Sequence, residues 1–281
     1  MRIAYLSTDF GIPVCGNKGA SIHVRELSAA LSNLGHDVEI LTSRAGGEAP
    51  EGFAVPVREY RLEPQERKKI SALKNEPGVA DPMVKEIRSM MYAANLRYRV
   101  MPHLMRSRPD ALYERYSLMG TAGGDIAKSL GIPHVLEVNA PLSEEHSRFR
   151  GSAFPDTIRR TEQQILASAD EVIAVSEPLR DWIISSGVSP ERVTVVPNGV
   201  DIERFSTTNL PEQVDPGFDG RPVVGFVGTL KGWHGTSTLI QSIGSIARQR
   251  GLERCPRLLI VGDGPERERL ESVARDEGIG E

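Results

Sequence analysis

The stretch VTVVPNGVDIERF, residues 193–205, divides the sequence into two runs of alternating strand and helix patterns. Its valines are β-branched and suit a buried strand. The proline that follows them cannot donate to a strand ladder, and Asn198-Gly199 is a turn pair that accommodates positive φ. The stretch therefore predicts that a strand ends here, that the chain turns sharply, and that a second α/β unit follows.

The residues before this stretch alternate between short apolar strands and helical patterns, which is typical of a doubly wound α/β sheet. Ligands of such sheets bind beyond the carboxyl ends of the strands, so the segment after each strand is a candidate site. Pro56 confines the strand expected at 53–62 to an outer, edge position. The other expected strands are residues 2–7, with a central place in the sheet, 37–42, 110–114, 133–138, 171–175 and 193–196.

The loop 8–19 connects the first strand to a helix whose apolar residues recur at helical spacing. Ser21 is the expected N-cap of this helix, and Gly35 suits the left-handed residue at its C-terminal end. Unpaired N–H groups and the helix dipole make such a helix N-terminus a ready site for anions. A dinucleotide site is disfavoured, because the loop lacks GxGxxG and no acidic residue ends the strand 37–42.

A long helix is expected from Asp81-Pro82 to about Met101, with one apolar stripe that core packing explains. The stripe comprises Val84, Ile87, Met91, Ala94 and Tyr98. The basic run Arg67-Lys68-Lys69 is interpreted as solvated surface, with contact to acidic lipid headgroups as the alternative.

The 281 residues suffice for one large or two modest domains, and a content of 39% hydrophobic and 26% charged residues is ordinary for a soluble protein. The net charge of -4 argues against a dedicated nucleic-acid binder. Cys15 and Cys255 show neither CxxC nor zinc-site spacing, which fits a reducing cytoplasm. The N-terminus, MRIAYLS, lacks the apolar core of a signal peptide, and no stretch reaches the length of a membrane span.

Four further motifs accompany the junction: CGNKGASIHVRELSAALSNLGHDVEILT at 15–42, ADEVIAVS at 169–176, VVGFVGTLKGWHGTSTLI at 223–240 and LLIVGDGPERERL at 258–270. Together with PNGVD at 197–201, this set resembles the retaining nucleotide-sugar glycosyltransferases of glycosyltransferase family four. Several motifs in the right order are far more specific than a single Gly-rich loop. The resemblance runs nearly from end to end of the chain.

The resemblance implies an α/β fold of the GT-B type, in which two doubly wound, Rossmann-like domains face each other across a cleft. The expected parts are an acceptor-side domain at 1–205, a linker at 206–221 and the first part of a donor-binding domain at 222–281. Asn198, Gly199 and Asp201 fall near the interdomain connection. The family's glutamate motif, which holds the donor sugar and ribose, does not occur in these residues. The second domain is therefore expected to be truncated, and this form of the chain to be inactive.

The resemblance also implies where the donor diphosphate binds. Gly16 and Gly19 are expected to let the backbone approach the diphosphate or the transferred sugar, with glycines that merely turn the chain as the alternative. In the second domain the family commonly has an arginine and a lysine where this chain has Thr229 and His234. Lys231 is the nearest permanent cation and the expected substitute, assisted by His234 when protonated. The glycines expected to admit the nucleobase are Gly262 and Gly264.

The acceptor is expected to bind at segments that follow the strands of the first domain. Many family members have a histidine near the reacting sugar where this chain has Asn139, which can contact a sugar hydroxyl but cannot act as a base. Glu137, Glu144 and Glu145 are candidates for orienting the acceptor hydroxyl, and Arg115 for binding an anionic acceptor group. A surface or salt-bridged role is the alternative for each.

The function implied is transfer of a sugar from a nucleotide-diphosphate donor to a hydroxyl of a glycan, lipid or small molecule, with retention at the anomeric carbon. No resident cofactor or metal is expected, because cations and backbone N–H groups can stabilise the departing diphosphate. A cytoplasmic location, with a peripheral membrane contact as an extension, accords with the composition. The alternatives are a non-catalytic module that binds an acceptor or partner and, less favoured, a sugar-nucleotide epimerase or a phosphorylase.

Overall fold

The computed structural model describes residues 1–203, 205 and 220–280. They divide into two compact units, Met1–Asp201 and Ile202–Glu281. The division falls four residues before the boundary expected at 205. Most of the linker expected at 206–221 lies outside the described residues.

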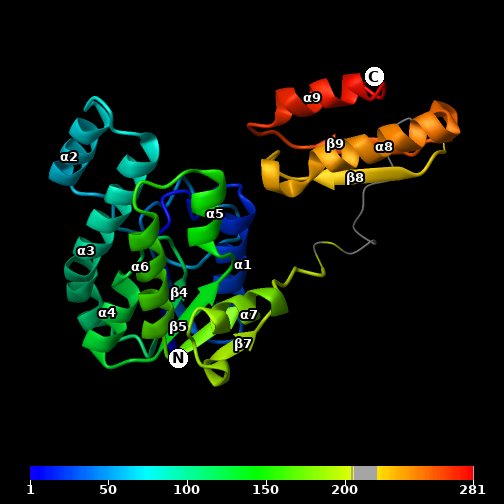
Figure 1. Cartoon of the computed structure of the whole chain (residues 1–281). Helices are drawn as coiled ribbons and strands as arrows, with labels where there is room; N and C mark the ends of the chain where they lie inside the picture. The colour runs from blue at the N-terminus through cyan, green and yellow to red at the C-terminus, as the bar shows by residue number, and fades with distance from the viewer. Residues whose placement is uncertain (204, 206–219, 281) are drawn as a thin grey trace. The chain divides into compact units, whose positions relative to one another are not determined.

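Seven parallel strands form the sheet of the first unit, in the order β3-β2-β1-β4-β5-β6-β7 (Figure 1). The central place expected for the first strand is confirmed, because β1 lies between β2 and β4. The strands are β1 (Arg2–Ser7), β2 (Asp37–Thr42), β3 (Val57–Glu59), β4 (Ala111–Arg115), β5 (His134–Val138), β6 (Glu171–Ala174) and β7 (Val193–Val195). The strand order, which proceeds outward from β1 in both directions, is that of a doubly wound fold.

β3 confirms the edge position expected for the strand around Pro56, although it is only three residues long. Pro56 has no N–H to donate, but its carbonyl oxygen accepts a hydrogen bond from the N–H of Ile40 at 2.8 Å. The pairing of β2 with β3 therefore begins at Pro56, which can still accept a hydrogen bond through its carbonyl oxygen. β3 follows immediately after this proline.

Helices cover both faces of this sheet (Figure 1). Consecutive residues of a strand face opposite sides, so Tyr5 packs with Val24 of α1 while Leu6 packs with residues of α3 and α4. The helices are α1 (Gly19–Asn33), α2 (Pro64–Lys74), α3 (Asp81–Ser107), α4 (Ala122–Leu130), α5 (Leu142–Phe149), α6 (Pro155–Ser168) and α7 (Glu177–Ser185). A short 3-10 helix, Pro190–Arg192, precedes β7.

The predictions for α1 are confirmed at one end only. Gly35 has φ +88° just beyond the helix, as expected. Ser21 is not the N-cap, because the helix begins at Gly19 with Lys18 as N-cap, and this places Ser21 in the first turn with no exposed surface.

The apolar stripe predicted on α3 is wrong in its C-terminal half. Tyr98 is 72% exposed, and the buried residues of this half are Leu96, Val100 and Leu104. The helix carries apolar residues on more than one face, so spacing alone does not select the face that meets the sheet. The helix also continues to Ser107, six residues beyond the expected end.

The sharp turn predicted at Asn198-Gly199 is absent. Neither residue has positive φ, and residues 196–200 carry no turn. The strand does end as expected, since β7 stops at Val195. The described turn residues of this stretch lie later, at Ile202, Glu203 and Phe205.

The second unit contains a two-stranded parallel sheet with its two longer helices on one face (Figure 1). Phe226 and Ile260 pack with the helices, whereas Val227, on the opposite face, is 81% exposed. The elements are β8 (Val223–Val227), η3 (Gly232–His234), α8 (Thr236–Arg250), η4 (Leu252–Arg254), β9 (Arg257–Val261) and α9 (Arg267–Asp276). One face of this sheet therefore has no helix over it among the described residues.

Candidate functional site

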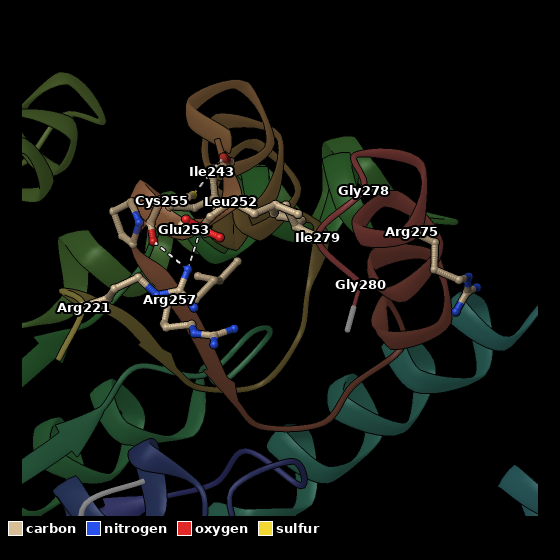
Figure 2. Close-up of a pocket in the computed structure, with 12 residues that line it drawn as sticks. Arg221, Ile243, Leu252, Glu253, Cys255, Arg257, Arg275, Gly278, Ile279 and Gly280 are labelled. Carbon is tan, nitrogen blue, oxygen red and sulfur yellow. Dashed lines mark hydrogen bonds between the residues drawn. The ribbon is translucent and has the colours of Figure 1, made fainter. Parts of the chain in front are cut away.

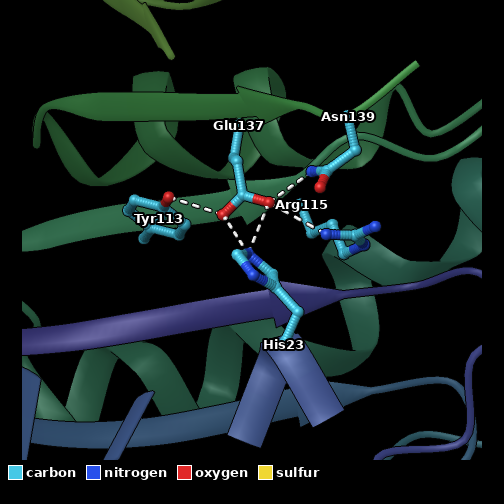
Figure 3. Close-up of polar contacts among 5 residues, drawn as sticks. All are labelled: His23, Tyr113, Arg115, Glu137 and Asn139. Atoms are coloured by element: carbon cyan, nitrogen blue, oxygen red, sulfur yellow. Dashed lines mark hydrogen bonds and ion pairs between the residues drawn. The ribbon is translucent and has the colours of Figure 1, made fainter. Parts of the chain in front are cut away.

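A buried carboxylate at the carboxyl end of β5 gathers polar side chains from three elements (Figure 3). Glu137, 1% exposed, accepts hydrogen bonds from His23 Nε2 at 2.9 and 3.0 Å, on its two oxygens. Its Oε1 also accepts Arg115 Nη1 at 2.9 Å and the side-chain amide of Asn139. Its Oε2 accepts the hydroxyl of Tyr113 at 2.7 Å. We call these five residues the Glu137 cluster.

The hydrogen bonds keep Glu137 ionised in spite of its burial. Burial alone raises the pKa of Glu137, but hydrogen bonds led by that from His23 outweigh it and hold the pKa below its usual value. Burial and the neighbouring carboxylate raise the pKa of Tyr113, so the phenol keeps its proton and donates it. A carboxylate whose two oxygens are occupied by donors is suited to hold its partners in place rather than to accept a proton.

Two residues that the sequence singled out, Arg115 and Asn139, thus meet at Glu137. Arg115 is 9% exposed and its charge is balanced by the carboxylate. Sequence reasoning missed His23, because its partner lies 114 residues away. The available signal was its place near the N-terminus of α1, the helix that follows the first strand.

The loop between β1 and α1 is held by its own backbone and by the side chain of Arg25 on α1. Gly16 donates its N–H to Pro13 O at 2.9 Å, and Arg25 Nη1 donates to Gly16 O at 2.8 Å. An added Cβ on Gly16 would lie 2.7 Å from Pro13 Cγ and 3.2 Å from Ser21 Oγ, so this glycine is required by packing. Gly19 differs, because an added Cβ there would meet nothing within 4 Å.

The segment that follows β5 is anchored by one buried and one exposed carboxylate, Glu162 and Glu144. Glu162 Oε1 accepts the hydroxyl of Tyr116 at 2.7 Å and the N–H of Ser143 at 3.1 Å. Glu144 Oε1 accepts the indole N–H of Trp182 at 2.7 Å, which ties α5 to α7. Glu145 donates its N–H to Pro141 O at 3.0 Å, but its side chain makes no hydrogen bond with another described residue. Glu144 and Glu145 therefore lie one after the other on α5, outside the Glu137 cluster.

In the second unit the loop after β8 brings Lys231 and two aromatic rings together. Lys231 Nζ lies 4.9 Å from the centroid of the Trp233 ring, and the rings of Trp233 and His234 are 5.8 Å apart. His234 Nδ1 contacts the carbonyl oxygen of Thr229 at 2.5 Å, so the imidazole is fixed on the same loop. This loop groups the cation and the imidazole that were expected at the diphosphate.

Gly262 and Gly264 follow β9 and touch the loop after β8. A Cβ on Gly262 would lie 1.9 Å from Gly228 O, and one on Gly264 would lie 2.3 Å from Leu230 O. Leu230 also donates its N–H to Asp263 O at 2.9 Å. The close approach of two loops is therefore a sufficient reason for both glycines, whether or not a nucleobase binds there.

A pocket of about 770 Å³ lies at the other end of these strands (Figure 2). Arg221 and Arg257 line it, and they stand at the amino ends of β8 and β9. Ligands of parallel sheets bind at the carboxyl ends, so this pocket is not the expected donor site. Among the described residues, no group of three His, Cys, Asp or Glu side chains is arranged to hold a metal ion. No helix in the same part of the chain is long and apolar enough to cross a membrane.

The sequence of this chain also matches a protein-family model. The model of Glycosyltransferase Family 4 matches residues 17–204, which include α1, the Glu137 cluster and all but the last residue of the stretch 193–205. The chain belongs to this family, and its fold is of the GT-B type.

Relatives and solved structures resemble nearly the whole chain. A D-inositol 3-phosphate glycosyltransferase of Pseudarthrobacter chlorophenolicus is 27% identical over 87% of this chain and 57% of its own length. A glycogen synthase of Mycobacterium tuberculosis is 25% identical over 98% of this chain and 64% of its own. This chain thus spans 57% and 64% of the lengths of these relatives.

Among solved structures, sucrose-phosphate synthase from Thermosynechococcus elongatus gives a TM-score of 0.66 at 18% identity, covering 99% of this chain and 68% of that one. Anabaena Alr3699/HepE in complex with UDP gives 0.64 at 18% identity, with coverage of 99% and 67%. At this identity the likeness establishes the fold.

Proposed function

We propose that this chain carries the acceptor-side domain and part of the donor-binding domain of a retaining glycosyltransferase. The observation that carries the proposal is the space beside the first turn of α1. The helix begins at Gly19, and a Cβ added there would meet nothing within 4 Å. N–H groups at a helix N-terminus, together with the helix dipole, favour a diphosphate. The hydroxyl of Ser21 in the same turn is fully buried and has no partner among the described residues.

The proposed reaction transfers a sugar from a nucleoside diphosphate to a hydroxyl group with retention. The N–H groups of α1 in the first unit are one candidate for stabilising the negative charge that develops on the departing diphosphate, and Lys231 with His234 in the second unit is another. A leaving-phosphate oxygen takes the acceptor proton on the same face of the sugar. Because cations and N–H groups supply this stabilisation, we propose that no resident metal or other cofactor is needed.

The Glu137 cluster has a positioning role in this proposal. Glu137 holds Arg115 and the side-chain amide of Asn139, and Asn139 contacts a hydroxyl of the transferred sugar through its remaining polar atoms. A rigid set of donors lowers the barrier by orientation, without a proton transfer of its own.

The substrates belong to the proposal as well. The structure of Alr3699/HepE contains UDP, which supports a nucleotide-sugar donor for this chain. The acceptor is a hydroxyl of a glycan, lipid or small molecule, and the reaction takes place in the cytoplasm, with peripheral membrane contact where the acceptor is a lipid. The net charge of -4 does not suit a nucleic-acid partner.

The substitution Gly19→Asp tests whether the diphosphate binds at the start of α1. An aspartate at the start of a helix stabilises the helix, yet it repels a diphosphate bound there. We expect UDP-sugar affinity to fall about tenfold or more, since a charge-assisted contact is worth about 1.5 to 3 kcal/mol. The matched control is Gly19→Ala, which adds only a methyl group in open space.

Transfer itself is tested by incubating the protein with a panel of nucleotide sugars and acceptors. Mass spectrometry detects the product, and proton NMR of its anomeric centre shows whether the configuration is retained. Inversion would contradict the retaining mechanism. Binding of donor and acceptor without product would agree both with the inactivity expected of this form of the chain and with the non-catalytic module. Failure to bind any nucleotide sugar would contradict the proposal.

A further inference from the structure

The N-terminal half of α3 contacts two segments that follow strands at the carboxyl edge of the sheet. Glu86 Oε1 accepts a hydrogen bond from His146 Nε2 at 2.8 Å, on α5, which follows β5. Two residues further on, the guanidinium of Arg88 lies 4.3 Å from the centroid of the Phe10 ring, in the loop that follows β1. Arg88 therefore stands beside the edge where parallel sheets bind their ligands.

The Nε of Arg88 has no hydrogen-bond partner, and its guanidinium has no ion-pair partner, among the described residues. Its Nε is buried and makes no hydrogen bond, and no carboxylate lies within ion-pair distance of its guanidinium. Asp9 is nearby, but its Oδ1 accepts the N–H of Gly11 at 2.6 Å. Burial lowers the pKa of Arg88, and the charge of Asp9 opposes this shift. A buried donor without a partner is uncommon and calls for an explanation such as a ligand.

Another arginine on the same helix shows that burial beside an aromatic ring does not by itself leave a guanidinium unpaired. Arg99 lies 6.0 Å from the ring centroid of Tyr92, and it pairs with Glu63 at 3.3 Å. It also donates to the carbonyl oxygen of Arg61. The fold thus gives Arg99 a counter-ion, although its buried Nη1 makes no hydrogen bond, whereas Arg88 has no ion pair among the described residues.

We propose that Arg88 binds an oxyanion, a phosphate or a carboxylate group carried by the acceptor substrate, at the loop after β1. The assignment to the acceptor rests on the proposed function. Stacking on Phe10 orients the planar guanidinium, whose paired N–H groups match the geometry of phosphate and carboxylate. Thr8 precedes Phe10 by two residues, and its Oγ1 lies 2.6 Å from Ser117 Oγ, which joins the loops after β1 and β4. Arg115, expected to bind an anionic acceptor, is less suited because Glu137 already balances its charge.

The proposal is tested by following arginine Nε–Hε resonances of the ¹⁵N-labelled protein by NMR. The Arg88 signal is assigned by its loss in Arg88→Lys. Inorganic phosphate, glucuronate and UDP are titrated separately at constant ionic strength. We expect phosphate or glucuronate to shift the Arg88 signal in a saturable manner, and the signal of Arg97, which stacks on Tyr98 on the same helix, to stay in place.

Substitutions of Arg88 and Arg97 distinguish the effect of losing the charge from the effect of losing side-chain packing. Arg88→Gln should weaken binding of the oxyanion about tenfold or more, Arg88→Lys should retain part of it, and Arg97→Gln should leave it unchanged. Equal affinity in Arg88→Gln, or no saturable shift with phosphate or glucuronate, would overturn the proposal. A shift with UDP alone would assign Arg88 to the donor and overturn it too. A saturable oxyanion site in a protein that binds no nucleotide sugar would contradict the proposed function while leaving the site itself in place.

Discussion

Glu114 on β4 and Glu137 on β5 are both 1% exposed, yet their pKa values are shifted in opposite directions. Burial raises the pKa of Glu114, and the hydrogen bond from His134 offsets this only in part. Burial acts on Glu137 as well, but the hydrogen bonds led by His23 outweigh it and lower its pKa. Two neighbouring strands therefore carry carboxylates with opposite effects on the pH dependence of stability.

The variant Glu137→Gln should lose about 3 kcal/mol of unfolding free energy at neutral pH, because it leaves Arg115 buried without its counter-ion. In the native protein the pKa of Glu137 lies below its unfolded value. Its contribution is therefore present above the unfolded pKa and is lost as pH falls through the native pKa. Urea unfolding from neutral to acidic pH measures this loss, which the variant should not show.

The control for this prediction is Glu177→Gln, an exposed glutamate at the start of α7. Its unfolding free energy should follow that of the wild type at each pH. If Glu137→Gln and Glu177→Gln behave alike, the Glu137 cluster does not stabilise the fold in the way its geometry indicates.

The variant Glu114→Gln should show the reverse trend. The native pKa of Glu114 is raised above its unfolded value, so the folded state holds the proton more tightly. Stability therefore falls as pH rises from the unfolded pKa through the native pKa. Glutamine cannot titrate, and the variant should gain stability relative to the wild type over this rise. A constant difference between the two proteins across the titration would contradict the raised pKa.

The sequence predicted the framework of the fold because strands and their order depend on local pattern. β1 and β2 have the expected bounds, and β3 lies at the edge where Pro56 required it. The face of α3 was not predictable in the same way, because both Tyr98 and Leu96 belong to apolar stripes. Only the packing of the whole helix against the sheet distinguishes them.

The sequence predicted several residues of the candidate site, but it predicted less well which of them contact one another. Arg115 and Glu137 were singled out near the carboxyl ends of expected strands and Asn139 at the place of the family's histidine, and the structure brings them together. His23 joins them from α1, and a contact across 114 residues leaves no local pattern. The open space at Gly19 and the crowding at Gly16 likewise depend on neighbours that the sequence does not reveal.

The variants Gly262→Ala and Gly264→Ala should each destabilise the second unit by about 1 to 3 kcal/mol, the usual effect of overpacking. The added methyl group would meet the backbone of the loop after β8 in both cases, and Gly262 also has φ +155°. Hydrogen exchange of α8 and β8 measures the effect. Gly232→Ala is the control, because its Cβ would have nothing within 4 Å. Equal protection in all three variants would show that the two loops do not need this close approach.

The last prediction concerns the cation of the second unit. If Lys231 is the main ligand of the donor diphosphate, Lys231→Ala should weaken UDP binding by about 1.5 to 3 kcal/mol, the usual value of a charge-assisted contact. Thr229→Arg should leave the affinity unchanged or raise it, because it adds a second cation on the same loop. Arg267→Ala is the control, since its guanidinium is exposed and already pairs with Glu271 at 2.9 Å. Calorimetric titration with UDP measures all three, and an unchanged affinity in Lys231→Ala would remove this residue from the donor site.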